Sequence, residues 1–205
     1  MTQEGGLPEP VQRGMEALWK VLDPSENSTG GGTASALAGA MAASLVAMVA
    51  RLSRGKRAME PQSFYAPLVE EAQGLSLELM EGAHTDAQAF YEVMEAYHLP
   101  KDNPQEREAR HNSIQRALEK AAQVPLHNAR LCARVLHLRG LLEKRSLPSA
   151  RSDLQCAGHL ALAGLRGCLD NVWVNLPHLE SRDLAEDIRK QAQELAQGVQ
   201  SLIPE

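Results

Sequence analysis

Residues 30–50 read GGGTASALAGAMAASLVAMVA, three glycines followed by small and apolar residues with no charge before Arg51. No alternating strand pattern interrupts this run, and its small residues recur at helical spacing. Such spacing predicts a helix that is buried on most of its sides and closely approached by other helices. The small residues lie on two faces, one with Ala36, Ala40 and Ser44 and the other with Gly39, Ala43 and Ala47.

The start of this helix is a candidate binding site for a small molecule. Gly30, Gly31 and Gly32 leave the backbone free to turn and let another group approach closely. Thr33 is a good N-cap for the helix that follows. A helix N-terminus presents unpaired N–H groups that can hold a carboxylate or a polarised carbonyl. The alternative is a simple tight turn. A P-loop is excluded because no Gly-Lys-Ser/Thr follows at the required spacing.

The uncharged run is long enough to raise the question of a membrane span, which needs about 20 apolar residues. Its content argues against one. The run consists mostly of Ala, Gly, Ser and Thr, with few Leu and no Ile or Phe, and such a segment inserts poorly into a bilayer. We therefore expect a helix of a protein core, and no membrane association.

Composition favours a single helical domain that covers residues 1–205, with residues 1–10 flexible. Hydrophobic residues make up 43% of the chain but aromatic residues only 3%, so the core must be built from Ala, Leu, Val and Met. Such side chains suit packed helices better than a β-sandwich. The formal net charge of −5 argues against a non-specific nucleic-acid binder, which usually carries a basic patch.

Cysteine and histidine patterns argue against a disulfide framework and against a metal site. Cys132, Cys156 and Cys168 are odd in number and form no CxxC pair, so we expect reduced thiols in the core. The seven histidines show no HxxxH or HxH spacing. No Ser-His-Asp arrangement is detectable. The polar start of the chain resembles no signal peptide, which predicts a cytoplasmic protein.

Apolar periodicity and helix-stop signals predict an all-α bundle of long helices. Pro125 falls inside one of them and is expected to kink or break it. Ser181 is a plausible N-cap for the last helix. The predicted helices cover residues 11–21, 33–53, 67–97, 105–142, 152–176 and 182–202.

Asp86 is the strongest candidate for chemistry. It fills a gap in the apolar stripe of the 67–97 helix, which consists of Leu75, Leu79, Ala83, Phe90, Met94 and Tyr97. A carboxyl group on a buried face without a cation has a raised pKa and can act as an acid or base near neutral pH. In the alternative reading, Thr85 caps a new helix and Asp86 is a favourable first-turn acid.

Two further groups of polar residues are candidates for ligand binding. Lys101, Arg110 and Gln115 can form an anion-holding edge at the start of the 105–142 helix, or they can be solvated. Asn171 and Asn175 lie one turn apart beside a buried face and need partners if they are buried. They can read the polar edge of a heterocycle or tie helices together, and we favour the second role.

Ser152-Asp153-Leu154-Gln155 is typical of a capping box, in which Ser152 is the N-cap and Gln155 bonds back to it. The apolar face of the helix that follows consists of Leu154, Ala157, Ala161, Leu165, Cys168 and Val172.

Taken together, these segments resemble the cyclodeaminase/cyclohydrolase family of folate one-carbon enzymes. The resemblance covers nearly the whole chain, and its most specific piece is Ser152-Asp153-Leu154-Gln155. The other matching pieces are Gly30-Gly31-Gly32-Thr33, Met48-Val49 before Gly55-Lys56-Arg57, Asp86-Ala87-Gln88-Ala89-Phe90, Leu99-Pro100-Lys101, Val124-Pro125-Leu126, Gly164, Gly167, Asn171-Val172 and Asn175-Leu176.

The resemblance implies an all-helical homodimer with a folate pocket near the subunit interface. It also implies that Asp86, which matches the family's catalytic aspartate, is the general acid and base. The substrate is then a tetrahydrofolate derivative, with no permanently bound cofactor. The residues expected to bind it are Gly30, Gly31, Gly32, Thr33, Lys101, Arg110, Gln115, Asp153, Gln155, Asn171 and Asn175.

Two reactions fit this resemblance, and we lean towards the first. A formiminotetrahydrofolate cyclodeaminase closes the 5,10-methenyl ring and releases ammonia, with its formimino substrate made by a separate formiminotransferase chain. A methenyltetrahydrofolate cyclohydrolase adds water to the methenyl cation in the same pocket. A third reading is a catalytically silent folate-binding or scaffold protein. Thr29 and His84 favour it, because they depart from residues that are common in the family.

Overall fold

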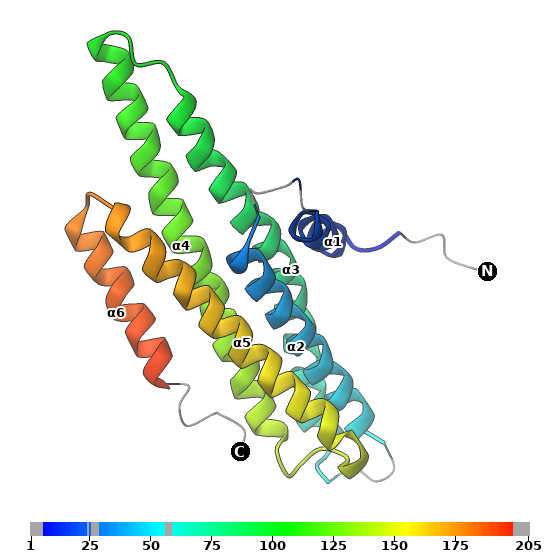
Figure 1. The fold of residues 1–205 in the computed structure, drawn as a ribbon. Coiled ribbons are helices and arrows are strands. Elements are labelled where there is room, and N and C mark those ends of the chain that lie inside the picture. The colour runs from blue at the N-terminus through cyan, green and yellow to red at the C-terminus, as the bar shows by residue number, and fades with distance from the viewer. Residues whose placement is uncertain (1–5, 24, 26–28, 56–58, 199–205) are drawn as a thin grey trace.

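A computed structural model describes residues 6–23, 25, 29–55 and 59–198. All regular structure in these ranges is helical, as Figure 1 shows. Six α-helices and two short 3-10 helices make up the bundle. In chain order they are α1 (Glu9–Leu22), α2 (Gly31–Ser53), α3 (Gln62–His98), α4 (Pro104–Leu142), η1 (Pro148–Ala150), α5 (Arg151–Asn175), η2 (Leu176–His178) and α6 (Arg182–Gly198).

The predicted all-α class is confirmed, and the predicted helices are all present with shifted ends. Helix α3 begins at Gln62, before the predicted start at Pro67, and this proline lies inside the helix. Helix α4 continues through Pro125, so the expected break is absent. Ser181 Oγ accepts a 3.4 Å hydrogen bond from the Leu184 amide, in keeping with its predicted N-cap role. The predicted end of the last helix, residue 202, lies outside the described residues.

Helix α2 is the central element of the bundle. It packs against α3 and α5, with α4 behind it, and Figure 1 shows it between these neighbours. Its inward faces consist mostly of small residues, and Gly39, Ala43 and Ala47 are all buried, as predicted. A Cβ on Gly39 would lie 2.5 Å from Cys132 Sγ of α4. A Cβ on Gly164 of α5 would lie 2.7 Å from the Ser35 carbonyl oxygen, so glycines set the spacing of these helices.

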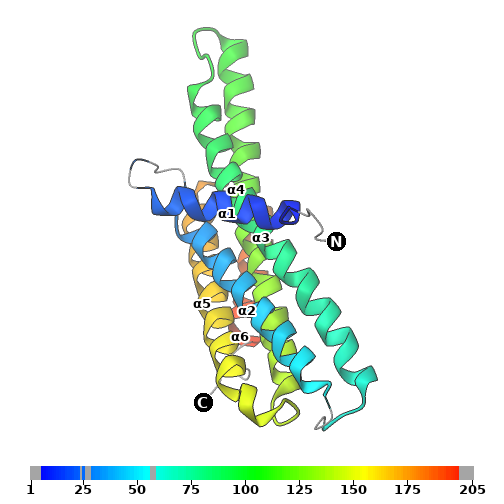
Figure 2. The same cartoon turned by 90° about the vertical axis from the view of Figure 1, so that its right-hand side faces the viewer.

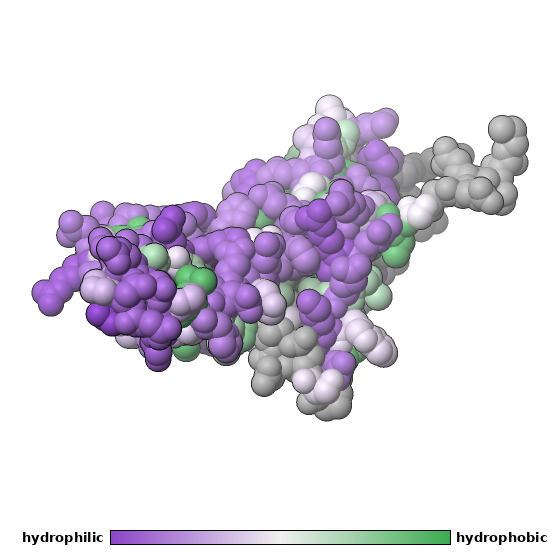
Figure 3. All heavy atoms as spheres, turned by 90° about the horizontal axis from the view of Figure 1, so that it is seen from above, coloured by the Kyte–Doolittle hydropathy of each residue, from purple (hydrophilic) through white to green (hydrophobic). Residues whose placement is uncertain are grey.

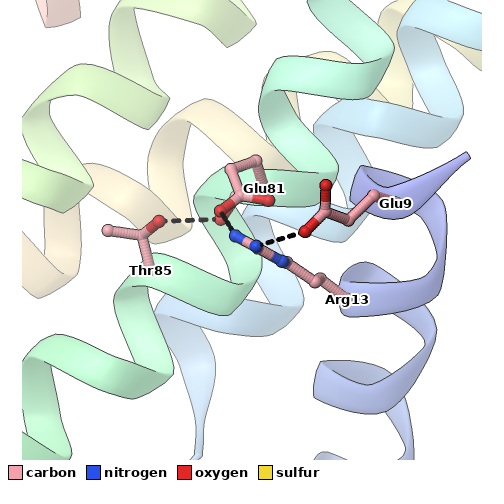
Figure 4. A network of polar contacts seen from close by, with 4 residues as sticks. All are labelled: Glu9, Arg13, Glu81 and Thr85. Atoms are coloured by element: carbon pink, nitrogen blue, oxygen red, sulfur yellow. Dashed lines mark hydrogen bonds and ion pairs between the residues drawn. The ribbon is translucent and has the colours of Figure 1, made fainter.

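Helix α1 crosses the bundle at the level where α2 begins (Figure 2). Gly14 lies against Met80 of α3, where a Cβ would overlap the Met80 sulfur. Figure 4 shows the polar contacts that hold α1 in place. Arg13 donates to Glu9 of its own helix at 2.5 Å and to Glu81 of α3 at 2.6 Å. This junction lies just over one turn from Asp86.

The far halves of α3 and α4 form a hairpin that projects beyond the other helices (Figures 1 and 2). The predicted apolar stripe of α3 is buried as far as Ala83, but its last members leave the core: Phe90, Met94 and Tyr97 are 44%, 43% and 48% exposed. This part of the prediction is wrong, because among the described residues no other helix covers the face of the hairpin on which these three side chains lie. Seen from above in Figure 3, this end of the molecule is mostly hydrophilic, with hydrophobic residues in small separate patches.

The cysteines only partly follow the prediction. All three are free, and Cys132 and Cys168 are buried between α4, α5 and α2. A hydrogen bond with the Cys132 thiol and, after it, burial raise the pKa of Cys168, so this thiol stays protonated and unreactive. Cys156 is exposed, contrary to the expectation of a core thiol, because it lies on the outer face of α5.

Candidate functional site

The N-terminus of α2 is capped by another helix. Gly30 is the N-cap residue, since its carbonyl accepts the first intrahelical bond from the Ala34 amide at 3.0 Å. Gly30 has no side chain to cap the free N–H groups, and no acidic residue lies in the first turn. Thr33, predicted to be the N-cap, is instead the third residue of the helix, and this prediction is wrong. The first-turn donors therefore need a partner from elsewhere.

Asp86 of α3 supplies that partner. Its Oδ2 accepts a 3.0 Å hydrogen bond from Thr33 Oγ1, and its carboxylate also accepts from the Thr33 backbone N–H. Helix α3 is continuous through this region, and Thr85 Oγ1 donates to the Glu81 carbonyl oxygen at 2.9 Å. The alternative in which Thr85 caps a new helix is therefore excluded. Asp86 takes the place of an N-cap side chain from a neighbouring helix.

Gly32 makes this contact sterically possible. A Cβ on Gly32 would lie 2.6 Å from both carboxylate oxygens of Asp86. Any side chain at this position would push the carboxylate away from the helix end. Gly32 therefore allows the Asp86 side chain to approach the backbone closely. The sequence suggests this role for the three glycines, beside the alternative of a simple tight turn.

The environment of Asp86 shifts its acidity in two directions. Burial raises its pKa above the ordinary value of 3.8, and the two hydrogen bonds from Thr33 oppose that rise without cancelling it. None of the described arginine, lysine or histidine side chains contributes to this pKa. Asp86 is therefore a lone carboxyl group whose proton affinity lies closer to neutrality than usual, which suits acid and base catalysis.

Thr29 adds an unused hydroxyl beside the glycines. Its Oγ1 is buried and has no hydrogen-bond partner within the described part of the chain. A buried polar atom without a partner costs free energy unless a ligand or water satisfies it. Ser35, one turn further into α2, donates from its Oγ to the Gly31 carbonyl oxygen at 2.5 Å and so fixes the first turn.

Asn171 lies next to the glycines and Asn175 one turn beyond it. Asn171 Nδ2 donates to the Gly167 carbonyl oxygen of its own helix at 2.8 Å, and a Cβ on Gly31 would lie 3.5 Å from this nitrogen. Asn175 Nδ2 donates to the Ala121 carbonyl oxygen of α4 at 2.8 Å. That carbonyl would normally bond the amide of residue 125, which as Pro125 has none. Asn175 therefore ties α5 to α4, in keeping with the role we favoured.

Lys101, Arg110 and Gln115 lie on the hairpin, away from Asp86. Arg110 donates to the Tyr97 carbonyl oxygen at 3.1 Å and stacks on the Tyr97 ring. Tyr97 follows Asp86 by eleven residues along α3, about 16 Å of helix. Gln115 Oε1 accepts from the Glu180 amide at 3.1 Å. Within one chain these residues do not join Asp86.

Asp153 and Gln155 lie at the opposite end of the bundle. The predicted capping box is absent, because α5 begins at Arg151 with Ala150 as N-cap and no side-chain cap. Asp153 is eighteen residues from Asn171 on the same helix, about 27 Å along its axis. The loop before α5 contacts the end of α2, where Leu147 N donates to Ser53 Oγ at 2.9 Å.

A groove of about 590 Å³ lies between α3 and α4 of the hairpin. Its walls include Tyr91, Glu95 and Arg116, and a 2.6 Å ion pair joins Glu92 to Lys120 across it. Neither Asp86 nor the glycines line this groove. The chemistry that the chain offers is concentrated at the N-terminus of α2, which the groove does not reach.

Similarity to known proteins identifies the family of the chain. Residues 14–194 match the formiminotransferase-cyclodeaminase family. The chain is 37% identical to methenyltetrahydrofolate cyclohydrolase from Methylorubrum extorquens, over 88% of each chain. It is 31% identical to formimidoyltransferase-cyclodeaminase from Mus musculus, over 79% of this chain but only 29% of that larger protein.

A solved structure extends the similarity to the fold. Formiminotetrahydrofolate cyclodeaminase from Thermotoga maritima superposes with a TM-score of 0.80 at 25% identity, covering 98% of this chain and 93% of that one. These relatives are enzymes, and the match spans every helix that surrounds Asp86. The chain belongs to the formiminotransferase-cyclodeaminase family.

Proposed function

We propose that this protein is a methenyltetrahydrofolate cyclohydrolase in which Asp86 is the general acid and base. The observation that carries the proposal is a lone, partly buried carboxyl group held at a helix N-terminus, with no cation among its described contacts. Such a carboxylate favours a substrate that carries positive charge at its reacting carbon. The methenyl cation has that charge. Identity of 37% over 88% of each chain to a cyclohydrolase supports the same reaction.

The reaction balances with one carboxyl group. As water attacks the methenyl carbon and the C–O bond forms, Asp86 accepts a proton from the water. Asp86 then donates that proton to N5 as the bond between carbon and N5 breaks. The hydroxyl proton leaves to solvent as the carbonyl forms, so the products are 10-formyltetrahydrofolate and one released proton. The raised pKa of Asp86 suits both transfers, because catalysis is most efficient when the pKa is near the working pH.

Formiminotetrahydrofolate cyclodeaminase activity is the second candidate. The sequence motifs alone favour this reaction over the cyclohydrolase. Its support is the fold similarity to the Thermotoga maritima enzyme. Here N10 attacks the carbon of the protonated amidine, Asp86 accepts the N10 proton, and the same proton goes to the NH2 nitrogen, which leaves as ammonia and leaves the positive charge on the methenyl product. The formimino substrate would come from a formiminotransferase in another chain. We rank this reaction second because the cyclohydrolase relative is more similar along its whole length.

The N-terminal turn of α2 supplies the remaining groups for binding. Thr29 Oγ1 is a buried hydroxyl without a partner in the described ranges, and it lies directly before Gly30. We propose that the Thr29 hydroxyl forms a hydrogen bond with a polar edge of the substrate. Gly30 and Gly31 are exposed and offer backbone N–H groups beside it. The protein is proposed to act as a homodimer, with the site near the subunit interface.

Absorbance of methenyltetrahydrofolate tests the proposal. Purified protein is mixed separately with 5,10-methenyltetrahydrofolate and with 5-formiminotetrahydrofolate, with an enzyme-free blank for spontaneous hydrolysis. Disappearance of the methenyl absorbance above the blank is the expected result. Appearance of that absorbance from the formimino substrate alone would assign the protein as a cyclodeaminase instead. Folate binding without turnover of either compound would show a silent paralogue.

A further inference from the structure

Asn128 of α4 is a buried polar side chain that the proposed reaction does not use. It is 0% exposed, and its Nδ2 donates a 3.2 Å hydrogen bond to the Gly82 carbonyl oxygen of α3. Its Oδ1 has no hydrogen-bond partner among the residues that the structure describes. A buried amide with an unpaired acceptor costs free energy, so its presence in an otherwise apolar core needs an explanation.

Gly82 leaves the space that this amide occupies. A Cβ on Gly82 would lie 2.2 Å from Asn128 Oδ1 and 2.9 Å from its Cγ, so no larger residue fits while Asn128 keeps its place. Glycine inside a helix is destabilising relative to alanine. Helix α3 therefore carries a cost at residue 82, and α4 carries one at residue 128. The two positions are matched to each other at the expense of stability.

The carbonyl that Asn128 contacts belongs to the turn of α3 that carries Asp86. Helix α3 is continuous here, and in an α-helix the carbonyl of residue 82 accepts the backbone N–H of residue 86. A carbonyl oxygen has two lone pairs and can accept two donors. The Gly82 oxygen therefore holds the backbone of Asp86 and the side chain of Asn128 at the same time.

Three helices hold this turn of α3. Arg13 of α1 donates to Glu81 at 2.6 Å, as Figure 4 shows, and Thr33 of α2 donates to Asp86 at 3.0 Å. Asn128 of α4 supplies the third contact, one residue after Glu81. The ion pair of Arg13 is partly exposed, and such pairs contribute little to rigidity or stability. The contact of Asn128 is the fully buried one of the three.

We propose that Asn128 is a positioning residue for Asp86. It fixes the rotation of residues 81–86 against α4, and through this turn it fixes the direction in which the Asp86 carboxylate meets Thr33. Its side chain is fully buried, so it acts through α3 and does not touch the substrate. The role rests on the proposed function, because the direction of the carboxylate matters for turnover only if Asp86 transfers protons.

The acidity of Asp86 reports whether the turn is held. Burial raises its pKa, and the two hydrogen bonds from Thr33 lower it. None of the described arginine, lysine or histidine side chains of the surrounding helices shifts it further. On α5, the Cys168 thiol, whose pKa is raised most by its hydrogen bond with Cys132, also feels the negative charge of Asp86. If the turn loosens, the bonds from Thr33 weaken, and the pKa of Asp86 should rise.

Asn128→Leu separates positioning from stability. Leucine has as many side-chain heavy atoms as asparagine and removes the unpaired acceptor, so Tm should stay the same or rise. Turnover should nevertheless fall by about tenfold or more, because misplacing a catalytic group by about 1 Å can cost about 10²-fold. KM should change by less than about twofold, since no substrate contact is lost. A leucine variant with the kcat of the wild type would overturn the proposal.

A double variant separates hydrogen bonding from packing. Gly82→Ala alone should lower Tm, because the new Cβ overlaps the Asn128 amide. Adding Asn128→Ala makes room for that Cβ, so the double variant should regain most of the lost Tm. Turnover should stay low, because residue 128 no longer donates to α3. Recovery of turnover together with Tm would show that Asn128 only fills space, and it would overturn the proposal.

Ser53→Ala is the control for losing a buried polar contact elsewhere. Ser53 is buried, and its Oγ accepts the Leu147 amide at 2.9 Å. It lies about 30 Å along α2 from Thr33. This variant should lower Tm and leave kcat unchanged. An equal loss of turnover in Ser53→Ala and Asn128→Leu would show a general response to core substitutions, contrary to the proposal.

Carbon-13 NMR of the Asp86 carboxyl group tests the positioning without any substrate. The signal is assigned by its absence from Asp86→Asn, and its titration is compared between the wild type, Asn128→Leu and Ser53→Ala. The pKa of Asp86 should rise in Asn128→Leu and stay unchanged in Ser53→Ala. An unchanged pKa in Asn128→Leu would overturn the proposal, even with low turnover. If the wild type turns over neither folate, the proposed function fails, and this titration still decides whether Asn128 holds the Asp86 carboxyl group in place.

Discussion

Thr33 Oγ1 donates a 3.0 Å hydrogen bond to Asp86 Oδ2, joining the first turn of α2 to the middle of α3 across 53 positions of sequence. The contact does two things at once. It gives the N-terminus of α2 the acceptor that Gly30 lacks, and it holds one carboxyl group in a fixed, partly buried position. Structure and chemistry therefore depend on the same pair of residues.

Gly32→Ala should displace this carboxylate. The added Cβ would lie 2.6 Å from both oxygens of Asp86, so the carboxyl group must move. We expect turnover to fall by about 10²-fold, the effect of misplacing a catalytic group by about 1 Å. Gly74→Ala on α3 is the control, because a Cβ there meets nothing within 4 Å. Equal activity of the two variants would show that the close approach of Gly32 is unimportant.

Thr33→Val should shift the pH dependence of the reaction. Its hydroxyl lowers the pKa of Asp86, so its loss raises that pKa further. The limb of the pH–rate profile that reports Asp86 ionisation should therefore move to higher pH. Stability should fall by about 1 to 3 kcal/mol, because a buried acceptor loses a donor. Profiles of kcat against pH check the shift, and an unmoved limb would mean that another group titrates.

Asp86→Asn should stabilise the protein near neutral pH. The folded chain binds the Asp86 proton more tightly than the unfolded chain, because the folded-state pKa lies above 3.8. Stability therefore decreases as pH rises from the ordinary pKa through the folded pKa, and this loss persists above it. Asparagine does not ionise, so the variant escapes this loss. Its Tm should exceed that of the wild type at neutral pH, and the difference should shrink below pH 3.8.

Asn175 and Pro125 should be energetically coupled. Asn175 Nδ2 donates to the Ala121 carbonyl oxygen, which lacks its helical donor because residue 125 is proline. Asn175→Ala should cost about 1 to 3 kcal/mol by leaving that carbonyl unpaired. In a Pro125→Ala background the helix supplies its own donor, and the cost should be smaller. Urea unfolding of the four proteins measures the coupling, and additive effects would contradict this explanation.

The helices were predictable from the sequence because their signals are local. Apolar spacing and prolines identified every α-helix of the described residues, and the stripe through Ala83 correctly indicated that Asp86 is partly buried. The same stripe continues through Phe90 and Met94 to Tyr97, and these three side chains are exposed. Periodicity shows which residues share a face, but it does not show whether another helix covers that face.

The contacts of the site were not predictable in the same way. Local rules predict Thr33 as an N-cap because they pair a hydroxyl with the first turn of its own helix, whereas this hydroxyl donates to Asp86 of α3. The roles of Gly32 and Ser35 also depend on helices or turns that meet only in the fold. Lys101, Arg110, Gln115, Asp153 and Gln155 remain predicted substrate contacts, and within one chain they lie far from Asp86.

Turnover of the Asp86→Asn protein tests the central claim most directly. The variant keeps the size of the side chain and an acceptor for Thr33 but cannot take up or release a proton. Its rate should be measured with 5,10-methenyltetrahydrofolate and with 5-formiminotetrahydrofolate, beside its folate affinity by calorimetry. We predict that the fold and most of the affinity remain while turnover falls by about 10²- to 10⁴-fold, the range of general acid and base catalysis. Near wild-type turnover on the substrate that the wild type uses would contradict the role of Asp86.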